Sequence, residues 1–219
     1  MHARRESRMS VRKVITRRSN HFRTYIPSIK NGRPTPCESM LEGMFARFCE
    51  VSPLVRSYEV QPERVTLDFG DHTERYVPDM HVQLATGKDV WVEVKPTVRL
   101  RSPRVAKRMA AAKAQFAAMG REFRVVTDAV LSTQPRAANI LELMYHRREP
   151  LSLADASNLR TFLMNARLET VADLSALVGD LEAWRLLGLG IVGIDLDLPI
   201  TSNSAIYLRG GHRHADIFA

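Results

Sequence analysis

Apolar residues recur at helical spacing in some segments and alternate in others, and the two patterns predict an order of elements. A first helix is predicted over residues 36–51, where the apolar residues share one face. Thr35 is its predicted N-cap, and Pro36 is its first helical residue. Glu38, three residues after Thr35, completes a capping box, which gives this carboxylate a structural role.

Strands are predicted after this helix. Four segments alternate between apolar and polar residues, and short turn sequences join them, which predicts an antiparallel meander. Pro78 in the third segment indicates a bulge or a local edge, because proline cannot donate a ladder hydrogen bond. The four segments are residues 55–61, 64–69, 74–84 and 89–95.

A helix and a returning strand complete this part of the chain. Residues 102–120 carry one apolar stripe after Ser102, a candidate N-cap, and residues 122–128 form a short apolar run. A helix–strand unit after a meander can place the new strand parallel to a neighbour. A further helix is expected over residues 136–146. The predicted class is therefore α/β, with a mixed sheet flanked by helices.

Residues 147–150 mark a predicted boundary. Beyond it the pattern indicates three short helices and then two strands, which is the order of a winged helix-turn-helix module. Thr170 is a candidate cap for the second of these helices. The elements cover residues 153–164, 170–179, 181–190, 191–199 and 204–209. The predicted domains are a basic flexible arm at 1–34, an α/β domain at 35–148 and a winged-helix-like domain at 149–219.

Positive charge is concentrated in two places. The net charge is +8, and residues 1–36 hold ten Lys or Arg against one acid. Residues 95–124 hold nine Lys or Arg against one acid, whereas residues 150–219 hold five Arg against eight acids. An arm and a central segment that are both basic favour a nucleic-acid partner. A solvating tail and an ordinary solvated helix face are the alternative.

Composition excludes several other classes. No run of eighteen apolar residues is present, so no membrane span is expected. The basic N-terminus lacks the apolar stretch of a secretory signal. Cys37 and Cys49 both fall in the first predicted helix and cannot easily bridge to each other, which indicates reduced thiols in a cytosolic protein.

Two carboxylates and an amine can converge on the hairpin of residues 76–96. Period two places Glu93 and Lys95 on one face of their strand, and Asp79 lies on the preceding strand. Carboxylate oxygens suit Mg²⁺ or Mn²⁺, and an adjacent ammonium can steady charge on a phosphoryl oxygen. Metal-assisted phosphodiester hydrolysis needs such groups. Cross-strand charge pairs on a solvated hairpin are the alternative.

Thirteen residues separate Asp79 from Glu93, and this spacing matches the PD-(D/E)xK nuclease signature. The wider series SMLEGMF, YVPDMHV, WVEVKP, a basic helix and VVTD resembles the TnsA family, the endonuclease subunits of heteromeric transposases. The resemblance covers roughly residues 35–145 and implies a restriction-endonuclease-like fold. It also implies an active site of Glu42, Asp79, Glu93 and Lys95, with Mg²⁺ or Mn²⁺ on Asp79, Glu93 and Glu42.

Glu38 competes with Glu42 for the helix position of this site, since the two lie four residues apart on one helix face. Glu42 is preferred, because Glu38 already has the predicted capping role and because Glu42 fits the SMLE segment. A solvated carboxylate at the helix edge is the alternative for Glu42.

The resemblance further implies cleavage at the 5′ ends of a mobile element, beside an integrase-type transposase that cuts the 3′ ends. In this family the C-terminal domain meets an ATPase regulator, and the acidic balance of residues 150–219 also favours a protein partner over DNA. Double-stranded DNA is the expected substrate, in the cytoplasm at the nucleoid. Five basic residues are expected to meet its phosphates: Arg99, Arg101, Arg104, Lys107 and Arg108.

Other residues are weaker candidates. Glu59 and Gln61 could line a substrate groove, and His81 could support Asp79, although ordinary strand positions explain all three. His212 and His214 are expected to be tail residues.

Two other functions fit the same residues. One is a non-catalytic DNA-binding adaptor or transcription regulator built on a nuclease-like scaffold. The other is a restriction or repair nuclease that acts alone.

Overall fold

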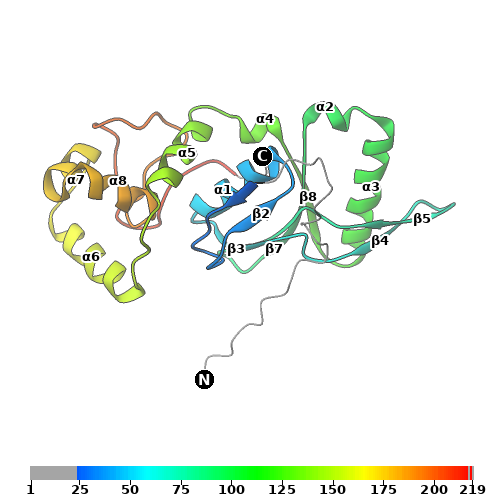
Figure 1. Ribbon diagram of the computed structural model, residues 1–219, viewed down its shortest axis with the longest axis horizontal. Coiled ribbons are helices and arrows are strands. Elements are labelled where there is room, and N and C mark those ends of the chain that lie inside the picture. Colours follow the sequence, from blue (N-terminus) through cyan, green and yellow to red (C-terminus); the bar gives the residue numbers. More distant parts are fainter. Residues whose placement is uncertain (1–23, 217, 219) are drawn as a thin grey trace, which may run out of the picture. The chain divides into compact units, whose positions relative to one another are not determined.

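The computed structural model describes residues 24–216 and 218, which form two compact units (Figure 1). In its described part, the first unit comprises residues 24–43 and 56–128. The second comprises residues 44–55, 129–216 and 218. This division differs from the predicted domain limits at residues 148 and 149, because the helix at 136–146 belongs with the C-terminal part of the chain.

The first unit contains a mixed four-stranded sheet in the order β3-β6-β7-β8. Strands β6 and β7 are antiparallel, whereas β7 and β8 are parallel with Glu93 opposite Val125, so the predicted parallel return is confirmed. Val90, Val92 and Val94 of β7 are all buried, as expected for a strand in the middle of a sheet. The strands are β3 (Val55–Val60), β6 (Met80–Leu84), β7 (Asp89–Lys95) and β8 (Glu122–Thr127).

The predicted single meander is wrong. Strands β4 (Val65–Asp68) and β5 (Thr73–Tyr76) pair with each other in a separate two-stranded sheet. The predicted strand over residues 74–84 is divided at residues 77–79 into β5 and β6. Pro78 lies in this interruption, where its ring fixes φ and removes a backbone donor.

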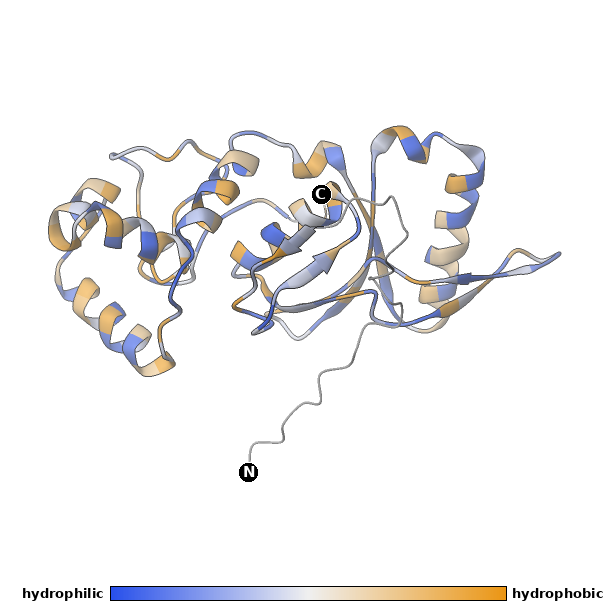
Figure 2. Cartoon of the chain, viewed as in Figure 1, coloured by the Kyte–Doolittle hydropathy of each residue, from blue (hydrophilic) through white to orange (hydrophobic). Residues whose placement is uncertain are grey.

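Helix α3 (Pro103–Ala118) follows the short α2 (Thr97–Leu100) and lies against β4 and β8. Figure 2 shows hydrophobic and hydrophilic residues alternating along α3, as in an amphipathic helix. Ser102 stands at the N-cap position, although its side chain makes no cap hydrogen bond. The apolar side of α3 packs on both sheets in one cluster of Val65, Leu67, Tyr76, Met109, Ala112, Phe116 and Phe123.

The segment before the first helix differs from the expectation. The prediction of a flexible arm over residues 24–34 is wrong, because β1 (Thr24–Ile26) pairs with β2 (Thr35–Cys37) in an antiparallel hairpin. The remainder of the predicted arm, residues 1–23, lies outside the described residues. Helix α1 (Met40–Val51) consequently begins four residues later than predicted. Thr35 lies in β2, so it does not cap α1.

The second unit is mainly helical in its described part. Helix α4 spans Asp128–Leu131, and the predicted helix over residues 136–146 is confirmed as α5 (Arg136–His146). Gly188 of α8 lies so close to α5 that a Cβ atom would stand 2.8 Å from the carbonyl oxygen of Leu143. The other helices are α6 (Leu153–Asn165), α7 (Val171–Val178) and α8 (Asp180–Gly188).

The predicted C-terminal strands do not form a ladder. Within residues 189–216 and 218 the chain makes isolated bridges only, Gly193 with Tyr207 and Asp195 with Arg213 among them. The segment that contains these residues therefore pairs with Tyr207 at Gly193 and with Arg213 only two residues later, at Asp195. Gly193 permits this, because a Cβ there would lie 1.9 Å from the carbonyl oxygen of Gly211. The three-helix order is present, and Thr170 caps α7 in a capping box with Asp173 as predicted.

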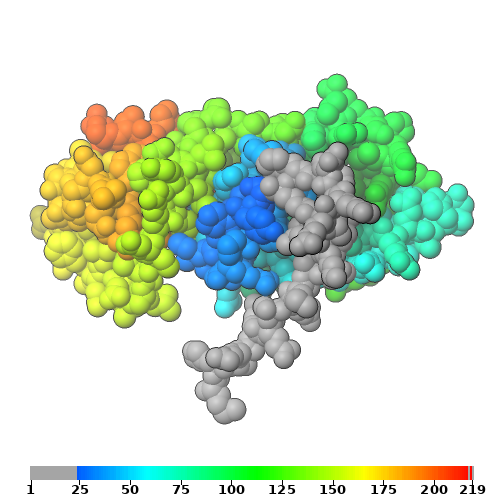
Figure 3. Space-filling model, in the orientation of Figure 1, coloured from blue at the N-terminus to red at the C-terminus, as the bar shows by residue number. Residues whose placement is uncertain are grey.

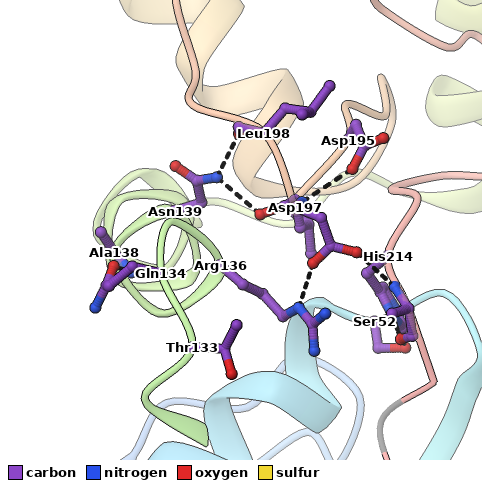
Figure 4. Close-up of polar contacts among 12 residues, drawn as sticks. Ser52, Thr133, Gln134, Arg136, Ala138, Asn139, Asp195, Asp197, Leu198 and His214 are labelled. Carbon is purple, nitrogen blue, oxygen red and sulfur yellow. Dashed lines mark hydrogen bonds and ion pairs between the residues drawn. The ribbon is translucent and has the colours of Figure 1, made fainter. Parts of the chain in front are cut away.

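A polar cluster fixes the C-terminal segment within this unit (Figure 4). We call it the Arg136 clasp; its members are Ser52, Arg136, Asn139, Asp197 and His214. The Arg136 Nε donates to Asp197 Oδ1, and Asn139 Nδ2 donates to the carbonyl oxygens of Leu196 and Leu198 at 2.9 and 2.8 Å. Polar groups of the clasp that lose contact with water on folding are thus hydrogen-bonded within the protein.

The expectation of loose tail histidines is wrong. His214 Nε2 lies 2.8 Å from Ser52 Oγ, and its ring packs edge-on against Phe48. His212 is buried, and its Nδ1 accepts the Ile194 N–H at 3.3 Å. No helix in the described part of the chain is long and apolar enough to cross a membrane.

Candidate active site

The candidate site lies where β6 begins and β7 ends. Asp79 directly precedes β6 rather than lying within the strand, and its backbone carbonyl accepts the Gln61 N–H at 2.9 Å. Glu93 and Lys95 lie near the end of β7 on the same face, as the alternation predicts. The hydrogen bond from Gln61 therefore joins β3 to the residue that supplies the first carboxylate.

The structure brings these three side chains together. Lys95 Nζ stands 2.6 Å from Glu93 Oε1 and 3.5 Å from Asp79 Oδ2. Asp79 Oδ2 also accepts the Val94 backbone N–H at 2.8 Å. The side chains of Glu93, Asp79 and Lys95 are 6%, 15% and 32% exposed, so water reaches the amine more than either carboxylate.

Glu42 approaches the same group from the first turn of α1. Its charge acts on both Asp79 and Lys95. Ser39 is the residue that caps α1, since its Oγ accepts the Glu42 N–H at 3.1 Å and donates to Glu42 Oε1 at 2.9 Å. The Glu38 N–H donates to Glu42 Oε2 at 2.8 Å. Glu42 rather than Glu38 is thus the capping carboxylate, so the capping role predicted for Glu38 is wrong, whereas the fit of Glu42 to the SMLE segment is unaffected.

The pKa values of Asp79, Glu42 and Lys95 all lie above their ordinary values. Burial, followed by the nearby charge of Glu93, raises the pKa of Asp79 to about 8. Burial also raises the pKa of Glu42, against the hydrogen bonds from Glu38 and Ser39. Burial alone would lower the pKa of Lys95, but the charges of Asp79, Glu93 and Glu42 outweigh it and raise that pKa. Lys95 is therefore a cation at neutral pH and cannot serve as a base.

Tyr76 is a site residue that the sequence did not indicate. This last residue of β5 is 3% exposed, and its hydroxyl donates to Glu93 Oε2 at 2.5 Å. Burial and the Glu93 charge raise the pKa of Tyr76, so its hydroxyl remains a donor. The only signal in the sequence was that Tyr76 lies three residues before Asp79. The alternation of side chains along a strand assigns such a tyrosine to the core and does not indicate a contact with Glu93.

The side chains of the site supply some, but not all, of the oxygen ligands that a hard divalent cation needs. Within residues 24–216 and 218, no group of three or more His, Cys, Asp or Glu side chains is arranged to hold a metal ion. Asp79 and Glu93 supply two carboxylates around the ammonium of Lys95. Magnesium is commonly held by one or two carboxylates, with waters and substrate phosphate as its other ligands. The residues therefore fit a cation that takes the remainder of its ligands from water and substrate.

The predicted DNA-binding residues divide into two sets. Three of them are exposed: Arg99 on α2, Arg101 between the two helices and Arg104 on α3. Figure 3 shows α2 and α3 in green at the surface of the first unit. Arg108 is engaged within the fold, since its guanidinium lies 5.5 Å from the centre of the Tyr76 ring. Lys107 Nζ likewise lies 5.4 Å from the centre of the Phe69 ring.

The weaker candidates have structural surroundings. His81 Nε2 stands 2.9 Å from Asp89 Oδ1, away from Asp79. Glu59 is half-buried in β3. Gln61 is buried in a left-handed conformation with φ of 46°, where its N–H holds the Asp79 carbonyl.

The comparison with protein families gives one match. Residues 52–128 match the family described as the TnsA-like endonuclease N terminal domain. Asp79, Glu93 and Lys95 lie inside the matched segment, whereas Glu42 and the second unit beyond residue 128 lie outside it. No curated protein matches the chain. The resemblance predicted from the sequence is confirmed for residues 52–128, which are similar to the TnsA-like endonuclease N-terminal domain.

Proposed function

We propose that this protein is the DNA endonuclease subunit of a heteromeric cut-and-paste transposase, and that it hydrolyses phosphodiester bonds at the 5′ ends of the mobile element. One observation carries the proposal. Lys95 Nζ lies between the carboxylates of Asp79 and Glu93, at 3.5 and 2.6 Å, inside the segment that matches an endonuclease family.

Each side chain has a separate task in this proposal. Asp79 and Glu93, with Glu42 beside them, would hold Mg²⁺ or Mn²⁺. When bound, such an ion polarises the scissile phosphate and lowers the pKa of a water molecule. Lys95, released from Glu93, neutralises the charge that develops on a phosphoryl oxygen and orients the attacking water. Water oxygen bonds to phosphorus, the bond to the 3′ oxygen breaks, and a 3′-hydroxyl and a 5′-phosphate result.

The central test removes the charged groups singly. Asp79→Ala and Lys95→Ala should each lower cleavage of a transposon-end duplex at least about 100-fold. The assay contains Mg²⁺ and the partner subunits. Lys88→Ala is the matched control, because Lys88 lies in the same hairpin but pairs with Glu122. Cleavage that survives both substitutions would remove the site assignment.

The same assay separates the alternative functions. Specific duplex binding without cleavage by the wild-type protein, even with its partners, would indicate a non-catalytic adaptor. Cleavage at full rate by the protein alone would indicate a restriction or repair nuclease. With DNA as the substrate, we expect the protein in the cytoplasm, at the nucleoid.

Duplex DNA is proposed to lie along α2 and the start of α3. Arg99, Arg101 and Arg104 are exposed there and follow Lys95 directly in sequence; Lys107 and Arg108 extend the positive charge along α3. Arg101→Ala should weaken duplex binding by a similar factor for all sequences and reduce the salt slope by about 1. Arg209→Ala, an exposed arginine of the second unit, should leave both unchanged. An unaltered slope for Arg101→Ala would move the DNA path elsewhere.

The partners are proposed from the family and from charge. An integrase-type transposase would cut the 3′ ends, and an ATPase regulator would meet the three-helix segment and its C-terminal extension at residues 149–219. The excess of acids in residues 150–219 supports a protein partner for this part of the chain, because DNA-binding modules present basic faces.

A further inference from the structure

Tyr76 is held rigidly beside the candidate site. It ends β5 of the smaller sheet, whereas Glu93 lies on β7 of the larger one. Its ring meets Phe123 edge-on with the ring centres 6.3 Å apart, and the Arg108 guanidinium lies 5.5 Å from its centre. Packing therefore fixes the place of the hydroxyl, which donates to Glu93 Oε2 at 2.5 Å.

This hydrogen bond occupies one of the two Glu93 oxygens. The other, Oε1, faces Lys95 Nζ at 2.6 Å. The Glu93 side chain is only 6% exposed, and a rotation that turned both of its oxygens toward one cation would leave the buried Tyr76 hydroxyl without its acceptor. Glu93 consequently has one oxygen, Oε1, to offer to a cation that enters beside Lys95.

We propose that Tyr76 is a positioning residue that makes Glu93 a one-oxygen ligand and thereby favours Mg²⁺ over Ca²⁺. The inference rests on the proposed function, because it takes Glu93 as a metal ligand. Calcium commonly takes both oxygens of a carboxylate, whereas magnesium requires a regular octahedron built from single oxygens and waters. Removing the hydroxyl frees Oε2 and opens the two-oxygen arrangement that suits the larger ion.

If Tyr76 only stabilised the fold, its replacement would change the cation affinities in a different way. Loss of packing or of a buried hydrogen bond would weaken the binding of every divalent cation by a similar factor. A positioning role instead changes the relative affinity for two cations of different size. The ratio of the two affinities is therefore the decisive quantity.

The experiment titrates the full-length protein, without DNA, with Mg²⁺, Mn²⁺ or Ca²⁺ alone in a calorimeter. Tyr76→Phe keeps the ring and removes the hydroxyl. It should lower the Mg²⁺ and Mn²⁺ affinities about 10-fold, as expected for loss of a group that orients a ligand. The Ca²⁺ affinity should stay the same or increase, so the Ca²⁺/Mg²⁺ affinity ratio should rise at least about 10-fold.

Tyr58→Phe is the matched control. Tyr58 is a buried tyrosine of β3 whose hydroxyl accepts from Thr35 Oγ1 rather than binding Glu93. It should leave the ratio unchanged. Thermal unfolding checks that each variant folds. Arg108→Ala, which loosens the Tyr76 ring but keeps its hydroxyl, provides a second variant and should raise the ratio by a smaller factor.

Two results would overturn the inference. One is an unchanged Ca²⁺/Mg²⁺ ratio in folded Tyr76→Phe; the other is an equal rise in the ratio in Tyr58→Phe. Failure of the proposed function looks different: the wild-type protein would bind none of the three ions, or Asp79→Ala would bind them as well as wild type. Ion binding that Asp79→Ala abolishes, with an unchanged ratio in Tyr76→Phe, would remove the inference alone.

Discussion

The candidate active site and the Arg136 clasp both take carboxylates out of water, with opposite charge balance. In the site, Glu42, Asp79 and Glu93 share the single ammonium of Lys95. Burial and mutual repulsion raise the pKa of Asp79. In the clasp, burial alone would raise the pKa of Asp197, but hydrogen bonds from Arg136 and the Ala215 N–H outweigh it and hold that pKa below its ordinary value.

This difference separates a chemical site from a structural one. A partly buried carboxylate with its own guanidinium and backbone donors is electrostatically satisfied and contributes to stability. Carboxylates that compete for one amine are not satisfied, and such perturbed groups concentrate at functional sites. The competition around Lys95 costs stability in the absence of a cation. The same excess of negative charge would attract a divalent cation.

The largest expected effect concerns the clasp. Arg136→Ala leaves Asp197 without its guanidinium partner and should lower the free energy of unfolding by about 2–4 kcal/mol, discounted for the partial exposure of Asp197. Urea unfolding measures this change. Arg209→Ala, an exposed arginine in the same unit, should cost less than about 0.5 kcal/mol. A loss of under 0.5 kcal/mol in Arg136→Ala would show that the clasp adds no stability.

The next effect distinguishes the two roles of Glu42. Glu42→Gln keeps an oxygen that can accept from Glu38 N–H or Ser39, but it removes the charge. Its free energy of unfolding should stay within about 0.5 kcal/mol of wild type, while cleavage falls about 10- to 100-fold. Glu42→Ala should lose about 1 kcal/mol as well, because the cap is lost.

Glu38→Gln is the control for this pair and should leave both cleavage and stability near wild type. Full cleavage by Glu42→Gln would reduce Glu42 to a capping residue and leave Asp79, Glu93 and Lys95 as the site.

The smallest effect, taken per pH unit, is the dependence of stability on pH. Asp79 has a folded-state pKa of about 8 against an ordinary value near 4, so between these values the folded protein holds a proton that the unfolded chain has released. The free energy of unfolding should therefore fall as pH rises across this window, by up to about 1.4 kcal/mol per pH unit. Urea unfolding between pH 5 and pH 8, with a chelator present, measures this slope.

Asp79→Asn should flatten the slope. Asp197→Asn should not, because the pKa of Asp197 is lowered and its stabilising contribution is lost only as pH falls below about 4. Equal slopes in wild type and Asp79→Asn would show that Asp79 is not the group that holds the extra proton.

Several elements of the fold have local causes that can be read from the sequence. Alternating valines specify β7, an apolar stripe specifies α3, and Thr170 with Asp173 specifies the start of α7. The sequence also indicated Asp79, Glu93 and Lys95, because period two and a short hairpin bring near neighbours together.

The long-range pairings, in contrast, depend on how the whole chain folds. The break at Pro78 sends β5 and β6 to different sheets, and this places Tyr76 on Glu93. Residues 24–26 pair with β2, which moves the start of α1 to Met40 and the cap to Ser39. Spacing along the chain records which residues can share a face. Which faces meet depends on how the whole core is filled, and no local pattern contains that information.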